Sequence, residues 1–121
     1  MEIGNIKFKA KKTLDGKWIK GDLVHHKDSD NVWITDYENQ LTSPVNPSTV
    51  CQFTGLKDKN GTPIYEGDIV IYKDNNAERR GIIVWDNESI AFCFGKGFFL
   101  CHFPTKNMVV IGNKFDGENN V

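Results

Sequence analysis

Apolar and polar residues alternate along much of this chain, and the pattern predicts short β-strands. In residues 6–11, apolar side chains alternate with lysines, a period of two that is typical of a strand with one buried side and one side facing water. Residues 18–24 form a second predicted strand, broken at Gly21-Asp22. Residues 32–37 form a third, because β-branched and aromatic side chains dominate there. We therefore expect a small β lobe at the N-terminal end.

Residues 42–48 carry two prolines and short polar side chains, a composition typical of a connection and not of a regular element. This segment is the best candidate for a boundary between two parts of the chain. We therefore expect an N-terminal β lobe of residues 1–48 and a second domain of residues 49–121, packed together as one compact unit.

The second half contains further apolar, β-prone runs separated by turns with Gly, Asn or Asp. These runs are residues 50–53, 64–72, 80–85, 89–94, 98–103 and 108–111. Short strands at this spacing predict a small barrel or sandwich. No amphipathic helical pattern lasts for three turns, and a short helix is expected only in residues 28–40 or near Pro104. The fold class is therefore expected to be mostly β with little helix.

The run from residue 89 to 103 is apolar on both faces if residues 95–97 form a hairpin loop. One face would carry Ile90, Phe92, Phe94, Phe98 and Leu100, and the other Ala91, Cys93, Phe99, Cys101 and Phe103. An antiparallel hairpin usually exposes one face to water, so two apolar faces indicate a covering layer. That layer is either the N-terminal lobe or another subunit, and we expect some self-association.

Residues 49–70, here called the signature segment, hold most of the turn-forming residues. Asn60-Gly61 favours positive φ at two successive positions, as a type I′ hairpin turn requires. Pro63 is expected at the start or edge of a strand because it lacks an N–H donor. Asp58 and Asp68 lie beside turn glycines, where a carboxylate commonly accepts backbone N–H bonds. We expect both to order the turns that precede strands.

The composition is that of a globular domain, with 39% hydrophobic and 26% charged residues in 121 positions. The formal net charge is −1, which does not favour general nucleic-acid binding through many phosphate contacts. Arg79 and Arg80 precede Trp85, so they are candidate nucleic-acid contacts. The alternative, which we prefer, is a charged loop tip with Trp85 in the core. The sequence lacks a secretion signal and a membrane-spanning run, so we expect a cytoplasmic protein.

Candidate chemistry is sparse. Three cysteines, an odd number, argue against a disulfide framework and for reduced, mostly buried thiols. Cys51, Cys93, Cys101 and His102 lack the closely spaced ligand pairs of a zinc site. Cys101 and His102 are adjacent and would point to opposite faces of a strand, the wrong geometry for a nucleophile and its base. We expect no cofactor, no metal and no enzyme activity.

The signature segment closely resembles the YopX-like family of phage and prophage proteins. The residues that carry the resemblance are Thr54, Gly55, Leu56, Asp58, Asn60, Gly61, Gly67 and Asp68, with Val110-Ile111-Gly112-Asn113 further on. Ile6-x-Phe8-x-Ala10 and Trp18-x-x-Gly21-Asp22-Leu23 fit the first half of the same family. Cys51 stands where the family more often has glycine, so the resemblance assigns no catalytic role to that thiol.

The resemblance implies a small, mostly β protein with an SH3-like barrel in its second half, active in the cytoplasm of a bacterial host. Its signature residues are of the types needed for turns and packing, so we give them structural roles. Our leading hypothesis is a non-enzymatic accessory protein that binds a protein partner or itself. The alternatives are a nucleic-acid-binding SH3-like module and an unrecognised enzyme, which would need a pocket with converging polar groups.

Overall fold

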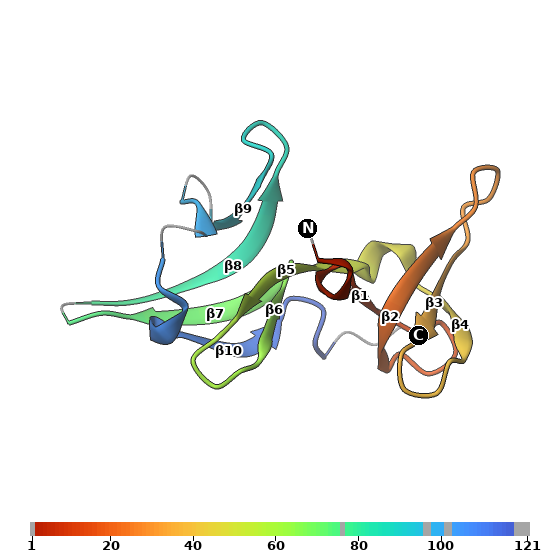
Figure 1. Cartoon of the computed structure of the whole chain (residues 1–121), viewed down its shortest axis with the longest axis horizontal. Coiled ribbons are helices and arrows are strands. Elements are labelled where there is room, and N and C mark those ends of the chain that lie inside the picture. Colours follow the sequence, from red (N-terminus) through yellow and green to blue (C-terminus); the bar gives the residue numbers. More distant parts are fainter. Residues whose placement is uncertain (1, 76, 96–97, 101–102, 118–121) are drawn as a thin grey trace. The chain divides into compact units, whose positions relative to one another are not determined.

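The computed structural model describes residues 2–75, 77–95, 98–100 and 103–117 and shows a mostly β chain (Figure 1). The strands are β1 (Phe8–Lys11), β2 (Trp18–His25), β3 (Val32–Asp36), β4 (Thr42–Val45), β5 (Cys51–Lys57), β6 (Pro63–Tyr65), β7 (Asp68–Lys73), β8 (Glu78–Asp86), β9 (Ala91–Phe94) and β10 (Met108–Asn113). The described helical elements include the 3-10 turns η1 (Ile3–Asn5), η2 (Pro47–Thr49) and η4 (Thr105–Asn107). The mostly β prediction is confirmed. None of the described helices is long and apolar enough to cross a membrane.

The chain divides into two compact units, one of residues 1–53 with 117–121 and one of residues 54–116. Strand β5 begins in the first unit and continues into the second. The domain boundary expected from the sequence, after residue 48, lies slightly before this division and stays a prediction, as does the packing of the two parts into one unit.

The first unit is built on an antiparallel sheet with the strand order β4-β3-β2-β1-β5. Its buried core consists of Ala10, Ile19, Ile34 and Val45, which come from four different strands. Partly buried apolar side chains of Phe8, Leu23, Val32 and Val50 pack around them. The period-two pattern of residues 6–11 thus places Phe8 and Ala10 on the core side of the sheet.

Three sequence-based expectations for the first unit are wrong. Gly21 does not interrupt β2, because the strand continues through it and pairs with β3. A glycine is needed at this position because a Cβ would lie 1.8 Å from the carbonyl oxygen of Thr35 on β3. Residues 42–45 form β4 and are not a connection, since a proline is tolerated on an edge strand. Lys11 does not face water: it is 4% exposed, and its ammonium lies 5.7 Å from the ring of its cross-strand neighbour Trp18.

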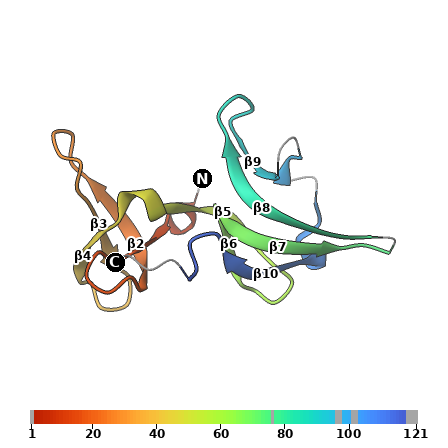
Figure 2. The same cartoon turned by 180° about the vertical axis from the view of Figure 1, so that it is seen from behind.

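The second unit contains an antiparallel sheet with the strand order β10-β7-β8-β9. It also contains the second half of β5 and its neighbour β6, which belong to the other sheet. Figure 1 shows β7 and β8 as a long hairpin and β9 returning along the far part of β8, and Figure 2 shows the same arrangement from behind. No closed barrel of paired strands is found among the described residues.

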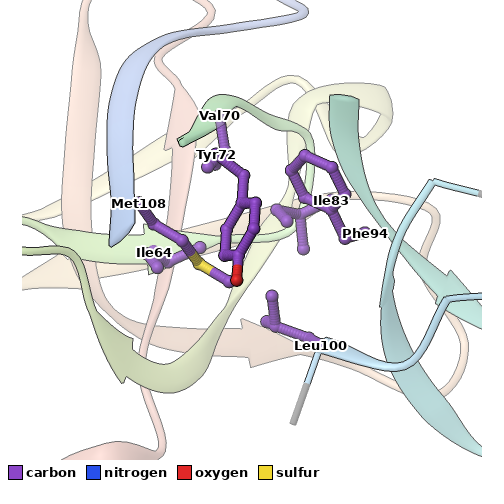
Figure 3. Packing of buried hydrophobic residues seen from close by; sticks show 7 residues of the cluster. All are labelled: Ile64, Val70, Tyr72, Ile83, Phe94, Leu100 and Met108. Carbon is purple, nitrogen blue, oxygen red and sulfur yellow. The ribbon is translucent and has the colours of Figure 1, made fainter. Parts of the chain in front are cut away.

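The core of the second unit brings together side chains from five strands and from the segment after β9 (Figure 3). Its buried members are Ile64, Val70, Tyr72, Ile83, Phe94, Leu100 and Met108. The ring of Tyr72 stands between the side chains of Met108 and Phe94, and it also meets Phe103 edge-on, with 5.1 Å between ring centroids. The aromatic residues of the second half therefore supply much of its buried surface.

The predicted strand of residues 98–103 is not formed in the described part of that segment, where only an isolated bridge joins Cys93 to Phe99. The predicted separation of Phe94 from Phe103 is also wrong, because their ring centroids are 5.3 Å apart. The Phe103 N–H donates to the Leu100 carbonyl (3.0 Å), and Phe103 packs against the core of the second unit. Cys101, also placed on that face, lies outside the described residues.

Candidate functional site

Asp58 organises the loop between β5 and β6. Its Oδ1 accepts the backbone N–H groups of Asn60 (2.8 Å) and Thr62 (2.9 Å), and its Oδ2 accepts that of Val110 on β10 (2.9 Å). Burial raises the pKa of the Asp58 carboxyl, but the three N–H donors outweigh it and hold the pKa below its ordinary value. Both oxygens of the carboxylate thus accept backbone N–H groups.

Asp68 has a similar task at the start of β7. Its Oδ2 accepts the Tyr65 N–H (2.7 Å), and its Oδ1 accepts the side-chain amide of Asn113 (2.9 Å). Asp68 is 1% exposed and Asn113 is 3% exposed, so both partners of this contact lie in the interior. The side-chain Oδ1 of Asn113 in turn accepts the backbone N–H of Phe115 (2.9 Å). The turn before β7 and the end of β10 are therefore held by one polar cluster.

The other signature residues also shape the backbone. The Thr54 hydroxyl donates to the Ile64 carbonyl (2.7 Å), which ties β5 to β6, and Leu56 packs against the core. Three glycines of the signature segment, Gly55, Gly61 and Gly67, have positive φ. The predicted type I′ turn is wrong, since Asn60 does not share the positive φ of Gly61. Instead, the Asp58 carboxylate accepts the Asn60 N–H, and the Asp58 backbone carbonyl accepts the Gly61 N–H (3.0 Å).

Arg79 and Arg80 lie within strand β8 and not at a loop tip, and both are exposed. The Arg79 guanidinium carbon lies 5.8 Å from the ring centroid of Phe98, which is 50% exposed. A pocket of about 370 Å³ lies beside them, lined by Arg79, Arg80, Gly81, Phe94, Gly95 and Phe98. This is a concave, largely apolar site with two cationic side chains at its rim.

Trp85 is not in the core, contrary to the interpretation preferred from the sequence. Its side chain is 39% exposed, meets Phe92 edge-on at 5.0 Å and donates from Nε1 to the Asn87 Oδ1 (2.8 Å). It lies two residues beyond the buried Ile83, where β8 and β9 extend past the core cluster. A second pocket of about 400 Å³, lined in part by Trp85, lies at this end of the hairpin.

Most of the exposed large apolar side chains of the second unit belong to β8, the turn after it, and the segment after β9. We call this set the β8–β9 surface; it consists of Ile82, Trp85, Ile90, Phe98 and Phe99, with exposed fractions from 37% to 75%. Ile90 also has a positive φ of 52°. This conformation is unfavourable for a β-branched residue and marks a position worth attention.

In the first unit, lysines of β1 and of the residue before it lie over aromatic rings. The Lys7 ammonium is 4.4 Å from the ring centroid of Phe53, and that of Lys9 is 4.7 Å from that of Trp18. Lysine side chains beside aromatic rings are one element of single-strand nucleic-acid sites. They are also a common way to pack a long side chain against a sheet.

Cys51 and Cys93 are buried and not joined in a disulfide, in agreement with the expectation from the cysteine count. Cys101 and His102, the other two residues considered for zinc, lie outside the described residues. Within the described part of the chain, no group of three or more His, Cys, Asp or Glu side chains is arranged to hold a metal ion. His26 packs edge-on against Trp33, with 5.4 Å between ring centroids.

Sequence reasoning missed the partners of the two signature carboxylates and the exposure of the β8–β9 surface. Asn113 could have been identified as a candidate partner, because it is the polar residue that ends the apolar run before it. Ile90 could have been identified as an exposed residue, since it is a large apolar residue directly after the polar turn residues 86–89. Val110 could not have been identified, because it contributes only its backbone N–H.

A family model described as YopX protein matches residues 7–119 of the chain. The match spans both units and includes the signature segment, Arg79, Arg80 and the β8–β9 surface. Among curated proteins, none matches the sequence.

Proposed function

The chain belongs to the YopX protein family, and we propose that it is a non-enzymatic accessory protein of phage or prophage type, which binds a protein partner or a second copy of itself in the bacterial cytoplasm. The observation that carries the proposal is the β8–β9 surface. Its large apolar side chains lie on one hairpin and the adjoining segment, between 37% and 75% exposed. Exposed large apolar side chains are a feature of interaction sites, and Trp and Phe are common interface residues.

The non-enzymatic part of the proposal is supported by what the signature carboxylates do. Asp58 accepts three backbone N–H groups, and Asp68 accepts one backbone N–H and the Asn113 amide. An acid or base in catalysis needs to reach a substrate in a cleft. The signature carboxylates thus stabilise the fold, and we assign partner binding to the β8–β9 surface.

Strain at Ile90 supports the same surface. A left-handed conformation costs an isoleucine about 1 kcal/mol or more, yet Ile90 is 75% exposed and contributes no core packing. A contact between the Ile90 side chain and a partner would explain why this unfavourable conformation occurs at an exposed hairpin tip.

The test is to compare the full chain with a Trp85→Lys/Ile90→Lys variant. Partner binding is measured by affinity capture from a bacterial host lysate with mass spectrometry, and self-association by size-exclusion chromatography with light scattering. We expect the captured partner, or the oligomer, to be lost in the variant. A Leu14→Lys/Leu41→Lys variant is the matched control, because these leucines are 91% and 65% exposed in the first unit.

The control variant should behave as the parent chain does. Equal binding by the β8–β9 variant, or equal loss in both variants, would contradict the assignment of this surface. A strict monomer that captures no protein would contradict protein binding altogether.

We also propose that the second unit is an SH3-like barrel at the level of topology. Support comes from two contacts that connect the loop between β5 and β6 to β10: the Lys59 N–H to the Met108 carbonyl (3.1 Å) and the Val110 N–H to Asp58 (2.9 Å). An experimental structure in which β10 pairs with β5 or β6 through a continuous ladder would support the barrel, and a clearly open sheet would contradict it.

Nucleic-acid binding is the second candidate function. It is favoured by Arg79 over the exposed ring of Phe98 and by Lys7 and Lys9 over aromatic rings of the first unit. Fluorescence anisotropy at low salt with single- and double-stranded DNA and RNA tests it. Binding that weakens steeply with salt is expected if the function is correct, and no binding at low salt would dismiss it.

A further inference from the structure

Strand β8 changes neighbours along its length. It pairs with β7 through residues 78–82 and with β9 through residues 83–86. In Figure 1 the hairpin of β7 and β8 accordingly continues well beyond the end of β9. Along residues 78–81, the edge of β8 that faces away from β7 has no strand paired to it among the described residues.

The backbone of this edge is available for pairing. The Ile82 carbonyl points to the β9 side, where it accepts the Gly95 N–H at 3.1 Å. In an antiparallel ladder, backbone groups of alternate residues point to the same side. The N–H and C=O groups of Arg80 therefore point to the open edge, as a site for strand addition requires.

A pocket adjoins this edge. It has a volume of about 370 Å³ and includes Gly81, Phe94 and Phe98 in its lining. The ring of Phe94 packs closely against the Gly81 backbone, since a Cβ at position 81 would lie 3.2 Å from that ring. The half-exposed ring of Phe98 supplies an apolar wall. One apolar side chain of an added strand would fit beside these groups.

The two arginines lie on opposite faces of the sheet at this point. Arg79 pairs with Tyr72 and shares its core-side face, whereas Arg80 pairs with Ile71 on the outer face. Side chains of an added strand also alternate between the two faces. An extended segment at this edge would therefore present its side chains to Arg79 and Arg80 in turn.

These arginines are not neutralised by carboxylates in the described part of the chain. The adjacent Glu78 is paired with Lys73 at 3.4 Å. Arg79 contacts the Phe98 ring, and no ion pair to either guanidinium is formed among the described residues. Arginine binds carboxylates through a planar fork of N–H donors, so acidic side chains complement this edge.

We propose that the open edge of β8 receives an extended acidic segment of a protein partner by strand addition, with carboxylates on Arg79 and Arg80 and an apolar side chain in the pocket. This inference rests on the proposed protein-binding function and names the class of partner. Single-stranded nucleic acid is less favoured, because two arginines are few phosphate contacts and the backbone edge would stay unused.

The test selects displayed random short peptides on the immobilised full chain and, in parallel, on an Arg79→Glu/Arg80→Glu variant. A Lys57→Glu/Lys106→Glu variant is the control, since it makes the same charge change at exposed lysines of the same unit. We expect the parent chain and the control to enrich peptides rich in Asp or Glu that contain an aromatic or branched apolar residue. The best peptide should bind the arginine variant at least about tenfold more weakly.

Strand addition has its own readout. Methylating alternate backbone nitrogens of the selected peptide should abolish binding when they face β8 and spare it when they face away. Absence of enrichment, enrichment of basic peptides, equal binding by the arginine variant, or indifference to methylation would each overturn the inference. Two further results would overturn it if acidic peptides do not bind. One is binding of an oligothymidylate that depends on the two arginines, and the other is self-association, measured by light scattering, that depends on them.

Failure of this inference is distinguishable from failure of the proposed function. If the Trp85→Lys/Ile90→Lys variant loses its partner but the arginine variant keeps it, protein binding stands and the β8 edge is not the docking site. Circular dichroism of each variant establishes that the exposed substitutions leave the fold intact.

Discussion

The carboxylate of Asp58 accepts the backbone N–H of Val110 at 2.9 Å, across 52 positions of the chain. The same carboxylate closes its own loop through Asn60 and Thr62. One side chain thus orders a turn and fastens that turn to β10. Because a hydrogen bond to a buried charged acceptor stabilises more than a neutral one, this contact is central to the stability of the second unit.

Replacing Asp58 by Ala should lower the free energy of unfolding by about 3 kcal/mol, because three backbone donors lose a charged acceptor. Urea denaturation followed by tryptophan fluorescence measures the change. Glu88→Ala, at an exposed acidic residue of the same unit, is the control and should change the midpoint little. An Asp58 variant that unfolds at the parent midpoint would contradict the role given to this carboxylate.

Stability should fall with acid in a way that depends on Asp58. The pKa of its carboxyl in the folded chain lies below the ordinary value of 3.8. As the pH falls through the unfolded value, the unfolded chain takes up a proton first, so stability is full above that pH and is lost toward the folded pKa. Between neutral pH and about pH 3, Asp58→Asn should lose less stability than the parent chain. Parallel denaturation curves at each pH decide this, and equal losses would contradict it.

The contact between Asp68 and Asn113 should show energetic coupling. Removing either partner leaves a buried polar group, so Asp68→Ala and Asn113→Ala are each expected to cost about 2 kcal/mol. The double variant should cost less than the sum of the two, with a coupling energy of about 1 kcal/mol. Urea denaturation of the four proteins completes the cycle. Strict additivity would show that the amide and the carboxylate act independently.

Gly21→Ala should destabilise the first unit severely, by about 3 kcal/mol or more, because overpacking forces the strands apart. The added Cβ would lie 1.8 Å from the Thr35 carbonyl oxygen. Gly4→Ala is the matched control, since nothing lies within 4 Å of a Cβ at that position. Thermal unfolding by circular dichroism compares them. Similar melting temperatures for the two variants would refute the close approach of β2 and β3.

Ile90→Asn should raise the free energy of unfolding by about 1 kcal/mol, since asparagine tolerates the left-handed conformation better than isoleucine does. The same change should weaken partner binding, because it removes the most exposed side chain of the β8–β9 surface. Thermal unfolding and partner capture are measured on one preparation, with Glu88→Asn as the control. A variant that gains no stability, or that gains it without losing binding, would contradict one half of the argument.

Local patterns predicted most strands correctly, because a period of two along a strand reflects a single buried face. Alternation in residues 6–11 and the β-branched run of residues 32–37 correspond to β1 and β3. The errors occur where a distant segment overrides a local preference. Gly21 was predicted to break a strand, but it lies where β2 approaches Thr35 closely. Asn60-Gly61 was predicted to form a type I′ turn, but the Asn60 N–H donates to the Asp58 carboxylate instead.

The candidate site was predictable only in part for the same reason. Arg79 and Arg80 were evident as a basic pair, but their position on an open strand edge depends on where β9 ends. Trp85 was predicted to be a core residue because its neighbours in the sequence are apolar. It is exposed because it lies in the part of the β8–β9 hairpin that extends past the core. Exposure of a side chain is set by which other segments pack on it, and short-range sequence does not contain that information.

By itself, the sequence determined the family, the mostly β class and the positions of the turns in the signature segment, since these depend on backbone preferences and on short spacings. Only the tertiary structure decided which N–H groups Asp58 and Asp68 bind, which apolar side chains stay exposed on the β8–β9 surface, and where β8 has no paired strand among the described residues. Those outcomes depend on contacts between residues tens of positions apart, whose geometry is fixed only when the sheets form.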